Sequence, residues 1–311
     1  MKILIELPSW LGDTIMATPA IENLINNFND ASFTLVGSMV AVEVLKDHPR
    51  VSGTYVLNNS YVNLFKIPKE LGRFDIFFSF RGSIRAKLLK LIVRSSRKFQ
   101  FDKGIYNKGH QVEKYNDFIN KSINKKFNPG RLVLYSRSKI EKKEKKEKKI
   151  LGINPGASYG SAKRWYPKEF AEVISALADK YDIIIFGGPE EQKSANEIEQ
   201  TLKKKGIKNF QNLASMTSIP ELISKIKNLD LFITGDSGPM HIAAAFQIPT
   251  ISIFGPTRIQ ETSQWLNSKN MIIKKDMKCR PCMKRTCPLG HHNCMKLIKA
   301  SDVLEAEEKI A

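Results

Sequence analysis

The stretch TGDSGPMHIAAAFQIPTISIFGPT, at residues 234–257, joins a strand to a helix and that helix to a second strand. An apolar run at residues 229–234 leads into it and ends in the turn Gly-Asp-Ser-Gly. A helix of small residues continues through residues 242–246, and Pro249 then opens another apolar run that ends in Gly-Pro-Thr. Strands and helices that alternate in this way indicate a parallel sheet covered by helices on both faces.

The turn at residues 235–238 has the composition of an anion-binding site. The first N–H groups of a helix have no partner within the helix, and the positive end of the helix dipole lies beside them. A phosphate bound next to Asp236 and Ser237 would use both features. The alternative is that one of these two side chains only caps the helix, because Asp and Ser are among the preferred N-cap residues.

The same alternation continues on the amino-terminal side of this stretch. In the first half of the chain we predict strands at residues 2–7, 33–36, 54–57 and 75–80, a helix at residues 19–28, and a helix with loops at residues 107–128. In the second half we predict strands at residues 150–154, 182–186 and 229–234, and helices at residues 167–181, 190–205 and 220–228. The fold class is therefore α/β, with two doubly wound domains in tandem.

A run of charged residues marks the expected boundary between these domains. Residues 139–149, KIEKKEKKEKK, contain seven lysines and three glutamates, which is typical of a solvated linker or a surface helix. We predict a first domain at residues 1–149 and a second at residues 150–311, which ends in a cysteine-rich segment and a helix. A chain of 311 residues is long enough for two such cores.

The composition limits the classes of partner. A net charge of +19 indicates an anionic partner, such as nucleic acid, an anionic membrane face or a phosphorylated glycolipid. The chain has no arginine-rich arm and no aromatic-rich RNA-binding signature, so we favour a lipid or membrane over nucleic acid. No apolar run approaches the ~20 residues of a membrane span, and the N-terminal MKILIELPSW lacks the apolar core of a signal peptide. We expect a cytoplasmic protein.

Four unusual loops follow the carboxyl ends of predicted strands. They are PSWLGD at residues 8–13, PGASYGSAKRW at residues 155–165, GGPEE at residues 187–191, and GDSG at residues 235–238. Ligands of open α/β sheets bind at this edge. Because one loop comes from the first domain and three from the second, we expect a ligand in a cleft between the domains.

Two pairs of charged residues lie in the loops of the second domain. Lys163 and Arg164 precede a helix and suit a pyrophosphate, although solvated surface charges are the alternative. Glu190 and Glu191 suit a ribose hydroxyl, or they lie in the first turn of a helix because its dipole favours acids there. Neither GxGxxG nor GxxxxGK[ST] occurs, so the chain has no dinucleotide fingerprint and no P-loop.

Asp13 is the carboxylate of the first loop. It follows Gly12, which leaves room for a substrate, and a carboxylate at the edge of a cleft can act as a general base toward a hydroxyl. The alternative, which the residues alone favour, is an N-cap for the helix that follows.

All four cysteines of the chain lie close together in the sequence. Cys279, Cys282, Cys287 and Cys294 have the spacing C-x2-C-x4-C-x6-C, with two histidines, at positions 291 and 292, between the last two. Four thiols at such spacing in a cytosolic chain indicate a metal site, most simply a structural zinc ion. The spacing fits no standard zinc finger, so a disulfide pair and plain reduced thiols remain open.

Four motifs in this order resemble the lipopolysaccharide heptosyltransferases of glycosyltransferase family 9, most closely the heptosyltransferase II branch. They are PSWLGD, PGASYGSAKRW, GDSGPMHIAAAFQIPTISIFGPT and CRPCMKRTCPLGHHNCM, which together span nearly the whole chain. The third motif is typical of the wider family, whereas the first and last are specific to that branch.

The resemblance implies a GT-B fold, in which two Rossmann-like domains face each other across a cleft. The donor would be ADP-L-glycero-D-manno-heptose, bound mainly by the second domain. The acceptor would be a heptosyl-Kdo-lipid A core, reached through the first domain by a monomeric enzyme at the cytoplasmic face of the inner membrane. Transfer would invert the anomeric carbon without a catalytic cofactor or metal.

The resemblance also assigns roles to residues. Asp13 falls on the catalytic base of the family, which reverses the preference from the residues alone, and Lys163 falls on the lysine that meets the donor phosphates. The expected donor-binding residues are Ser158, Lys163, Glu190, Glu191, Asp236, Ser237, Gly238, Met240 and His241. The expected acceptor-side residues are Ser9, Trp10 and Gly12.

Three rival functions remain. One is another heptosyltransferase, or a related GT-B sugar transferase with a different acceptor. Another is a basic, zinc-containing nucleic-acid-binding protein, which would explain the charge and the cysteines but not the four loops. The third is a sugar-nucleotide epimerase, which shares the fold and would need no lipid acceptor.

Overall fold

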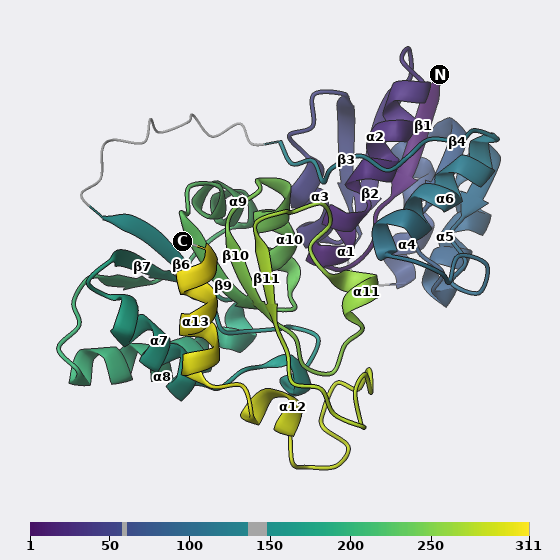
Figure 1. Cartoon of the computed structure of the whole chain (residues 1–311). Helices are drawn as coiled ribbons and strands as arrows, with labels where there is room; N and C mark the ends of the chain where they lie inside the picture. Colours follow the sequence, from purple (N-terminus) through teal and green to yellow (C-terminus); the bar gives the residue numbers. More distant parts are fainter. Residues whose placement is uncertain (58–60, 136–147, 311) are drawn as a thin grey trace. The chain divides into compact units, whose positions relative to one another are not determined.

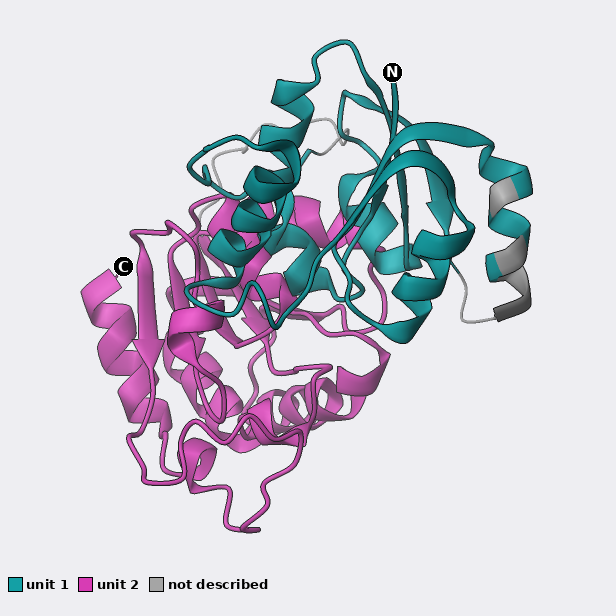
Figure 2. Ribbon diagram, turned by 90° about the vertical axis from the view of Figure 1, so that its right-hand side faces the viewer, with its two compact units in different colours: residues 1–137 teal, residues 138–311 magenta. Residues whose placement is uncertain are grey.

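The computed structural model describes residues 1–57, 61–135 and 148–310, which form two compact units (Figures 1 and 2). Unit 1 comprises Met1–Arg137 and unit 2 comprises Ser138–Ala311. Most of the Lys/Glu run that we expect at the boundary, residues 139–147, lies outside the described residues.

Unit 1 is built on a parallel sheet of five strands in the order β3-β2-β1-β4-β5. The strands are β1 (Lys2–Glu6), β2 (Ser32–Gly37), β3 (Val51–Val56), β4 (Arg73–Ser79) and β5 (Arg94–Gln100). The central strand β1 is apolar on both faces, with Ile3, Leu4 and Ile5 fully buried, as a strand between two helical layers must be.

Within residues 1–57 and 61–135, six helices accompany the sheet of unit 1. They are α1 (Leu11–Met16), α2 (Thr18–Asn27), α3 (Met39–Leu45), α4 (Tyr61–Leu71), α5 (Ile84–Ile92) and α6 (Gln111–Ile123). Helices α1 and α2 pack against α6, and α1 also packs against α3, whereas α4 packs against α5. Beneath α4 and α5, a core cluster joins Leu64 and Leu89 to Phe77 of β4 and Leu4 of β1.

Unit 2 is built on a parallel sheet of six strands in the order β11-β10-β9-β6-β7-β8. The strands are β6 (Lys149–Asn154), β7 (Tyr181–Ile185), β8 (Phe210–Asn212), β9 (Leu231–Gly235), β10 (Thr250–Ile253) and β11 (Asn270–Ile273). The chain crosses from β7 and β8 on one side of β6 to β9 on the other. This reversal creates a switch point at the carboxyl ends of the strands, where α/β folds bind ligands.

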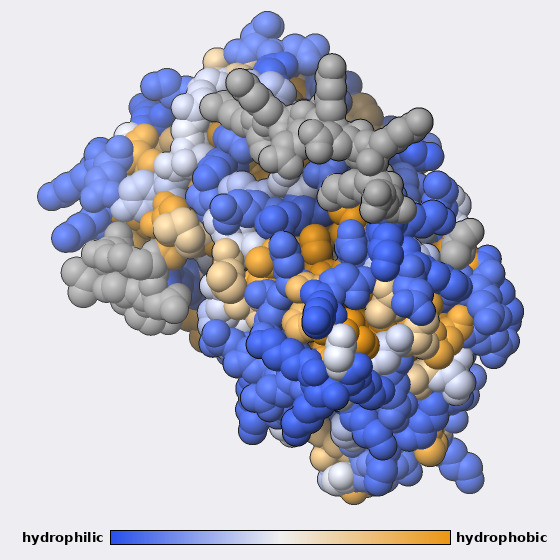
Figure 3. All heavy atoms as spheres, turned by 90° about the vertical axis from the view of Figure 1, so that its left-hand side faces the viewer, coloured by the Kyte–Doolittle hydropathy of each residue, from blue (hydrophilic) through white to orange (hydrophobic). Residues whose placement is uncertain are grey.

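The helices of unit 2 include two short 3-10 turns, η1 (Ser161–Lys163) and η2 (Pro189–Glu191). The α-helices are α7 (Pro167–Leu177), α8 (Gln192–Lys204), α9 (Ile219–Lys227), α10 (Gly238–Ala245), α11 (Ile259–Thr262), α12 (Asn293–Lys296) and α13 (Ala300–Ile310). Helix α7 packs against α8 and the C-terminal α13, and α9 packs against α10. Hydrophilic side chains cover most of the face shown in Figure 3, with apolar residues in smaller groups.

The α/β class with doubly wound parallel sheets is confirmed, but several boundaries differ from those we predict. The helix that we expect at residues 167–181 ends at Leu177, because Tyr181 already pairs in β7. The polar edge strand β5 and the short strand β8 lack the apolar runs that reveal the central strands, and the apolar run of β11 is only three residues long. Helix α1 begins at Leu11, within the loop that the sequence predicts at residues 8–13. Among the described residues, no helix is both long enough and apolar enough to span a membrane.

Candidate functional site

Three loops of unit 2 meet at the carboxyl ends of β6 and β9. Asn154, the last residue of β6, reaches across to the neighbouring strand. Its side-chain amide donates to Thr234 Oγ1 at 3.4 Å, Ser237 Oγ at 3.2 Å and the Gly156 carbonyl at 3.1 Å. The sequence motifs did not single out Asn154, because a lone asparagine at a strand end carries no signal until the neighbouring strand is known.

Lys163 and Asp236 form a buried ion pair in the centre of these loops. The Lys163 ammonium lies 2.6 Å from Asp236 Oδ2, and the exposed fractions of the two side chains are only 11% and 4%. Thr257, just beyond β10, donates its hydroxyl to the same carboxylate oxygen at 2.6 Å. The pair brings together two residues that are 73 positions apart and were both predicted to bind the donor.

The turn before α10 is not a simple helix cap. Ser237 occupies the N-cap position, but its side chain makes no capping hydrogen bond and instead contacts Asn154 and Thr234. The Asp236 carboxylate is engaged with Lys163 and Thr257. The capping alternative for this turn is therefore wrong, and no side chain caps the N-terminus of α10.

The structure places four other predicted donor-binding residues at different depths. Met240 is fully buried and its N–H donates to the Ser237 carbonyl, while His241 is also buried. Gly238 is half-buried at the start of α10, and Ser158 is exposed in the loop after β6. Of these four residues, Gly238 and Ser158 present atoms to solvent.

The cysteine-rich segment fixes the turn that carries Lys163 through contacts with Tyr159 and Ala162. Its ammonium lies 4.7 Å from the centre of the Tyr159 ring, and the Arg285 guanidinium lies 5.5 Å from the same ring. Tyr159 donates its hydroxyl to the Met283 carbonyl at 2.8 Å, and the N–H of Ala162 donates to the Arg285 carbonyl at 3.0 Å. The turn that carries Lys163 is thus fixed by residues more than a hundred positions later.

Glu190 and Glu191 differ in environment. Glu191 is buried, accepts a hydrogen bond from the N–H of Gly188 at 2.8 Å, and lies against Gly156. The Glu190 side chain is 70% exposed and lies 3.3 Å from the Arg164 guanidinium. Both carboxylates belong to η2 at the start of α8, as the helix-terminus alternative predicts.

The four cysteines line one small cavity, together with His291 and His292. Burial, together with the nearby thiols of Cys279, Cys282 and Cys287, raises the pKa of the Cys294 thiol. However, in the described part of the chain no three His, Cys, Asp or Glu side chains lie in position to hold a metal ion. Both ring nitrogens of His292 are engaged, with Tyr166 and the Ala162 carbonyl. These two hydrogen bonds leave His292 no ring nitrogen for a metal ion.

In unit 1, the PSWLGD motif follows β1 and runs into the first turn of α1. Thr14 holds this turn by donating its hydroxyl to the carbonyls of Pro8 and Trp10. Asp13 lies inside the first turn of α1, where the helix dipole favours a carboxylate, and the N-cap position belongs to Trp10. The N-cap alternative for Asp13 is therefore wrong.

The residues beside Asp13 are arranged as a partly open surface. Trp10 is about half exposed, while Ser9 and Gly12 are of intermediate exposure. The Ser9 carbonyl accepts a hydrogen bond from the Ser38 hydroxyl at 3.1 Å. Burial and the nearby charge of Asp13 raise the pKa of Tyr115, a residue of α6 that lies behind α1.

A buried carboxyl group that the sequence analysis does not identify lies at the carboxyl ends of the strands of unit 1. Glu6, at the carboxyl end of β1, is almost fully buried and bonds to the Ser79 hydroxyl at the end of β4. Arg81 lies 3.4 Å from its other oxygen. Burial raises the pKa of Glu6 to about 7, against the lowering effects of Ser79, Arg81 and Arg85. A perturbed carboxylate two residues before the PSWLGD motif is typical of a functional edge.

Comparisons with known proteins agree with these features. Residues 79–293 match the family model described as glycosyltransferase family 9 (heptosyltransferase). The lipooligosaccharide heptosyltransferase 2 of Campylobacter jejuni subsp. jejuni is 42% identical over 316 residues, which cover 100% of this chain and 98% of that protein. The lipopolysaccharide heptosyltransferase 2 of Escherichia coli K12 is 24% identical, over 98% of this chain and 97% of that protein.

Solved structures show the same fold. The E. coli ADP-heptose lps heptosyltransferase II superposes with a TM-score of 0.83 at 23% identity, covering 100% of this chain and 98% of that chain. The E. coli heptosyltransferase WaaC with ADP gives a TM-score of 0.77 at 17% identity, with full coverage of both chains. The predicted GT-B fold is therefore confirmed.

Proposed function

This chain belongs to glycosyltransferase family 9, the heptosyltransferases, and we propose that it moves heptose from ADP-L-glycero-D-manno-heptose to the heptosyl-Kdo-lipid A inner core of lipopolysaccharide. It is a glycosyltransferase of the heptosyltransferase type. The observation that carries the choice of acceptor is the 42% identity, over the whole chain, to a lipooligosaccharide heptosyltransferase 2. The alternative is another heptosyltransferase step, since E. coli lipopolysaccharide heptosyltransferase 3 is 25% identical to this chain.

Unit 2 (residues 150–311 in our domain assignment) binds the ADP part of the donor. The Lys163 ammonium and the uncapped N-terminus of α10 lie at the same strand ends, beside Gly238, and both favour a diphosphate. Asp236 holds the ammonium in place before the donor arrives. The exposed loop residue Ser158, the glutamates of η2 and the turn residues that follow β9 complete the donor site.

Unit 1 (residues 1–149 in our domain assignment) presents the acceptor to Asp13. The Asp13 carboxylate takes the proton from the acceptor hydroxyl as that oxygen attacks the anomeric carbon of the heptose. The bond from the anomeric carbon to the ADP oxygen breaks on the opposite side, so the configuration inverts and the sugar passes through an oxocarbenium-like state. Ser9, Trp10 and Gly12 border the acceptor.

The departing ADP gains negative charge in this step, and Lys163 with the N-terminus of α10 stabilises it. Preorganised donors of this kind are worth roughly 10²–10³ in rate each, so the reaction proceeds without a catalytic metal ion. A monomeric enzyme at the cytoplasmic face of the inner membrane would meet both substrates. A structural zinc ion at the four cysteines would require their thiols to turn toward a common centre, and elemental analysis of the purified protein tests that assignment.

A transfer assay tests the proposed donor and reaction. The purified chain is incubated with heptosyl-Kdo-lipid A and either ADP-heptose or a UDP-sugar. The mass of the lipid product is then measured by mass spectrometry. We expect a gain of one heptose with ADP-heptose alone. Transfer from the UDP-sugar would replace the proposed donor. Conversion of ADP-heptose without any lipid product would instead support the epimerase.

A further inference from the structure

The segment that runs from the end of β4 through β5 has an unusual composition. Residues 81–98, RGSIRAKLLKLIVRSSRK, contain seven Lys or Arg residues and no Asp or Glu. In unit 1 this segment comprises α5, which packs on the core, and β5, which is the edge strand of the sheet. Arg81 and Arg85 act on the buried Glu6. The other five cations of the segment are Lys87, Lys90, Arg94, Arg97 and Lys98.

Helix α5 is apolar on the side that faces away from the core as well as on the side that faces it. Ala86 and Leu89 are buried beneath the helix. Ile84 and Leu91, seven positions apart and therefore on one face, are 76% and 73% exposed. These are the two most exposed large apolar side chains in the part of the chain that the structure describes. A solvated helix would carry polar residues at both positions.

Cations lie on the same helix and on the strand that follows it. Lys87 lies on α5 between them and is exposed, and Lys90 lies one position before Leu91. Arg94 and Arg97 are exposed on β5, and Lys98 donates to the Leu91 carbonyl at 3.0 Å. Charges on an edge strand also prevent pairing with other sheets. That role explains the arginines of β5 but not the apolar residues of α5.

We propose that α5 and β5 form a docking surface for an anionic phospholipid bilayer, with Ile84 and Leu91 inserted at the level of the headgroups. Lys87, Lys90 and Arg94 then lie against the lipid phosphates. A short helix with apolar and basic residues on its outer face has the chemistry of an interfacial anchor. This inference rests on the proposed function, because it is the lipid-linked acceptor that requires unit 1 to approach a membrane.

Co-flotation with vesicles tests the surface. The full chain is mixed with one of two kinds of vesicle. The neutral vesicles contain phosphatidylcholine alone, and the anionic vesicles also contain about 30% phosphatidylglycerol, which makes their surface strongly negative. We expect the wild type to float with the anionic vesicles and not to bind the neutral vesicles. The double variant Lys87→Gln/Arg94→Gln should bind the anionic vesicles roughly 10- to 30-fold more weakly, at about fivefold per cation. The double variant Ile84→Gln/Leu91→Gln should weaken binding by at least tenfold, since it removes the inserted side chains.

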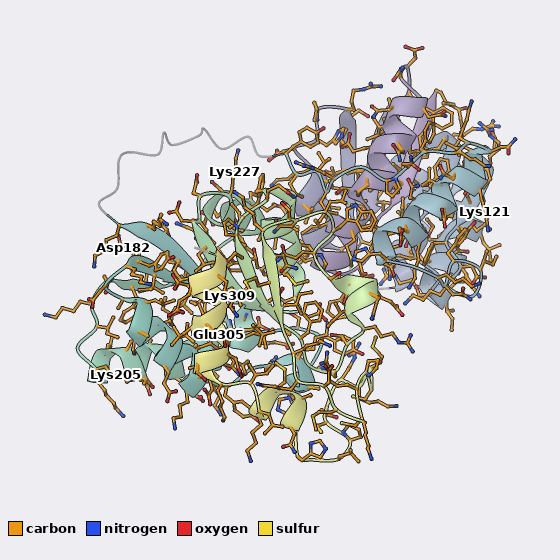
Figure 4. All side chains as sticks on the ribbon, viewed as in Figure 1. Lys121, Asp182, Lys205, Lys227, Glu305 and Lys309 are labelled. Carbon is orange, nitrogen blue, oxygen red and sulfur yellow. The ribbon has the colours of Figure 1, made fainter. Side chains whose placement is uncertain are left out.

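Matched controls come from unit 2. The double variant Lys204→Gln/Lys205→Gln removes two exposed cations at the end of α8, and Lys205 points into solvent in Figure 4. Met216→Gln removes an apolar side chain that is 71% exposed. Both should leave vesicle binding within twofold of the wild type. Binding to neutral vesicles as tightly as to anionic ones, or equal losses in the control and α5 variants, would overturn the docking surface.

A second measurement separates this inference from the proposed function. Transfer is measured with an acceptor that has been stripped of its acyl chains, in the absence of vesicles. With this acceptor, the α5 variants should transfer heptose at the wild-type rate. Their transfer rate should be lower than that of the wild type only when the acceptor is embedded in anionic vesicles. If the wild type transfers no heptose to either acceptor but still floats with anionic vesicles, the proposed function fails and the docking surface stands.

Discussion

Replacing Lys163 with methionine removes the ammonium that lies 2.6 Å from the buried Asp236 carboxylate. Removing one partner of a buried pair costs about 3–5 kcal/mol of folding free energy, because a charge is left buried without its counter-ion. Thr257 still donates its hydroxyl to that carboxylate, so we expect the loss near the lower end, about 3 kcal/mol. Urea denaturation of the wild type and the variant measures it.

The same variant also loses the cation that we assign to the donor diphosphate. A hydrogen bond to a charged group is worth about 1.5–3 kcal/mol, so the dissociation constant for ADP should rise roughly 10- to 150-fold. Turnover of ADP-heptose at saturation should fall a further 10²-fold or more, because the ammonium also stabilises the charge of the departing ADP. Titration calorimetry with ADP and steady-state kinetics measure the two effects separately.

A double variant distinguishes the two roles of Lys163. Asp236→Asn added to Lys163→Met removes the unpaired charge, so most of the folding free energy should return while ADP binding and turnover stay low. The account is refuted if Lys163→Met binds ADP with the wild-type affinity. It is equally refuted if the double variant regains turnover together with stability, since Lys163 would then act only by holding the fold.

Three further changes test other parts of the site. Asp13→Asn should reduce turnover by roughly 10²–10⁴ with an unchanged dissociation constant for ADP, and a variant that keeps wild-type turnover would exclude Asp13 as the base. For Glu6, whose pKa burial raises from 4.5 to about 7, the folded state holds its proton more tightly than the unfolded chain. The free energy of unfolding should therefore fall by about 3 kcal/mol as the pH rises from about 4.5 to about 7, and Glu6→Gln should lose that slope in denaturation measured across this range. Gly156→Ala would place a Cβ atom in overlap with Glu191 Cγ, so we expect a loss of about 1–3 kcal/mol in urea denaturation, most of which Glu191→Ala should restore.

The central strands and the strand-end loops could be predicted from the sequence, because their apolar runs and glycine-bounded turns are local signals. Strand β5 could not, since its sequence RSSRKFQ is that of an exposed edge and carries no apolar alternation. Helix α1 was missed for a related reason. Its first turn is held by Thr14, whose hydroxyl bonds back to Pro8 and Trp10, and a motif with proline and glycine resembles a loop.

The candidate site was predictable in its charged residues but not in their partners. Lys163 and Asp236 were each identified as donor-binding, whereas their ion pair depends on the pairing of β6 with β9. Asn154 and Glu6 were missed because each acts through a strand that is distant in the sequence. The cysteine spacing suggested zinc, but the thiols line a cavity without the geometry of a metal centre in the described chain.

The most direct test of the central claim is the rate of heptose transfer from ADP-heptose to two purified acceptors, Kdo-lipid A with and without one heptose, in the presence of EDTA. We predict ADP release and a heptosylated product with the heptose-bearing acceptor, and neither with the bare acceptor. Transfer to the bare Kdo acceptor would contradict the assigned step and make the chain an enzyme that adds the first heptose. Loss of transfer on addition of EDTA would contradict a reaction in which Lys163 and the N-terminus of α10 take the place of a metal ion.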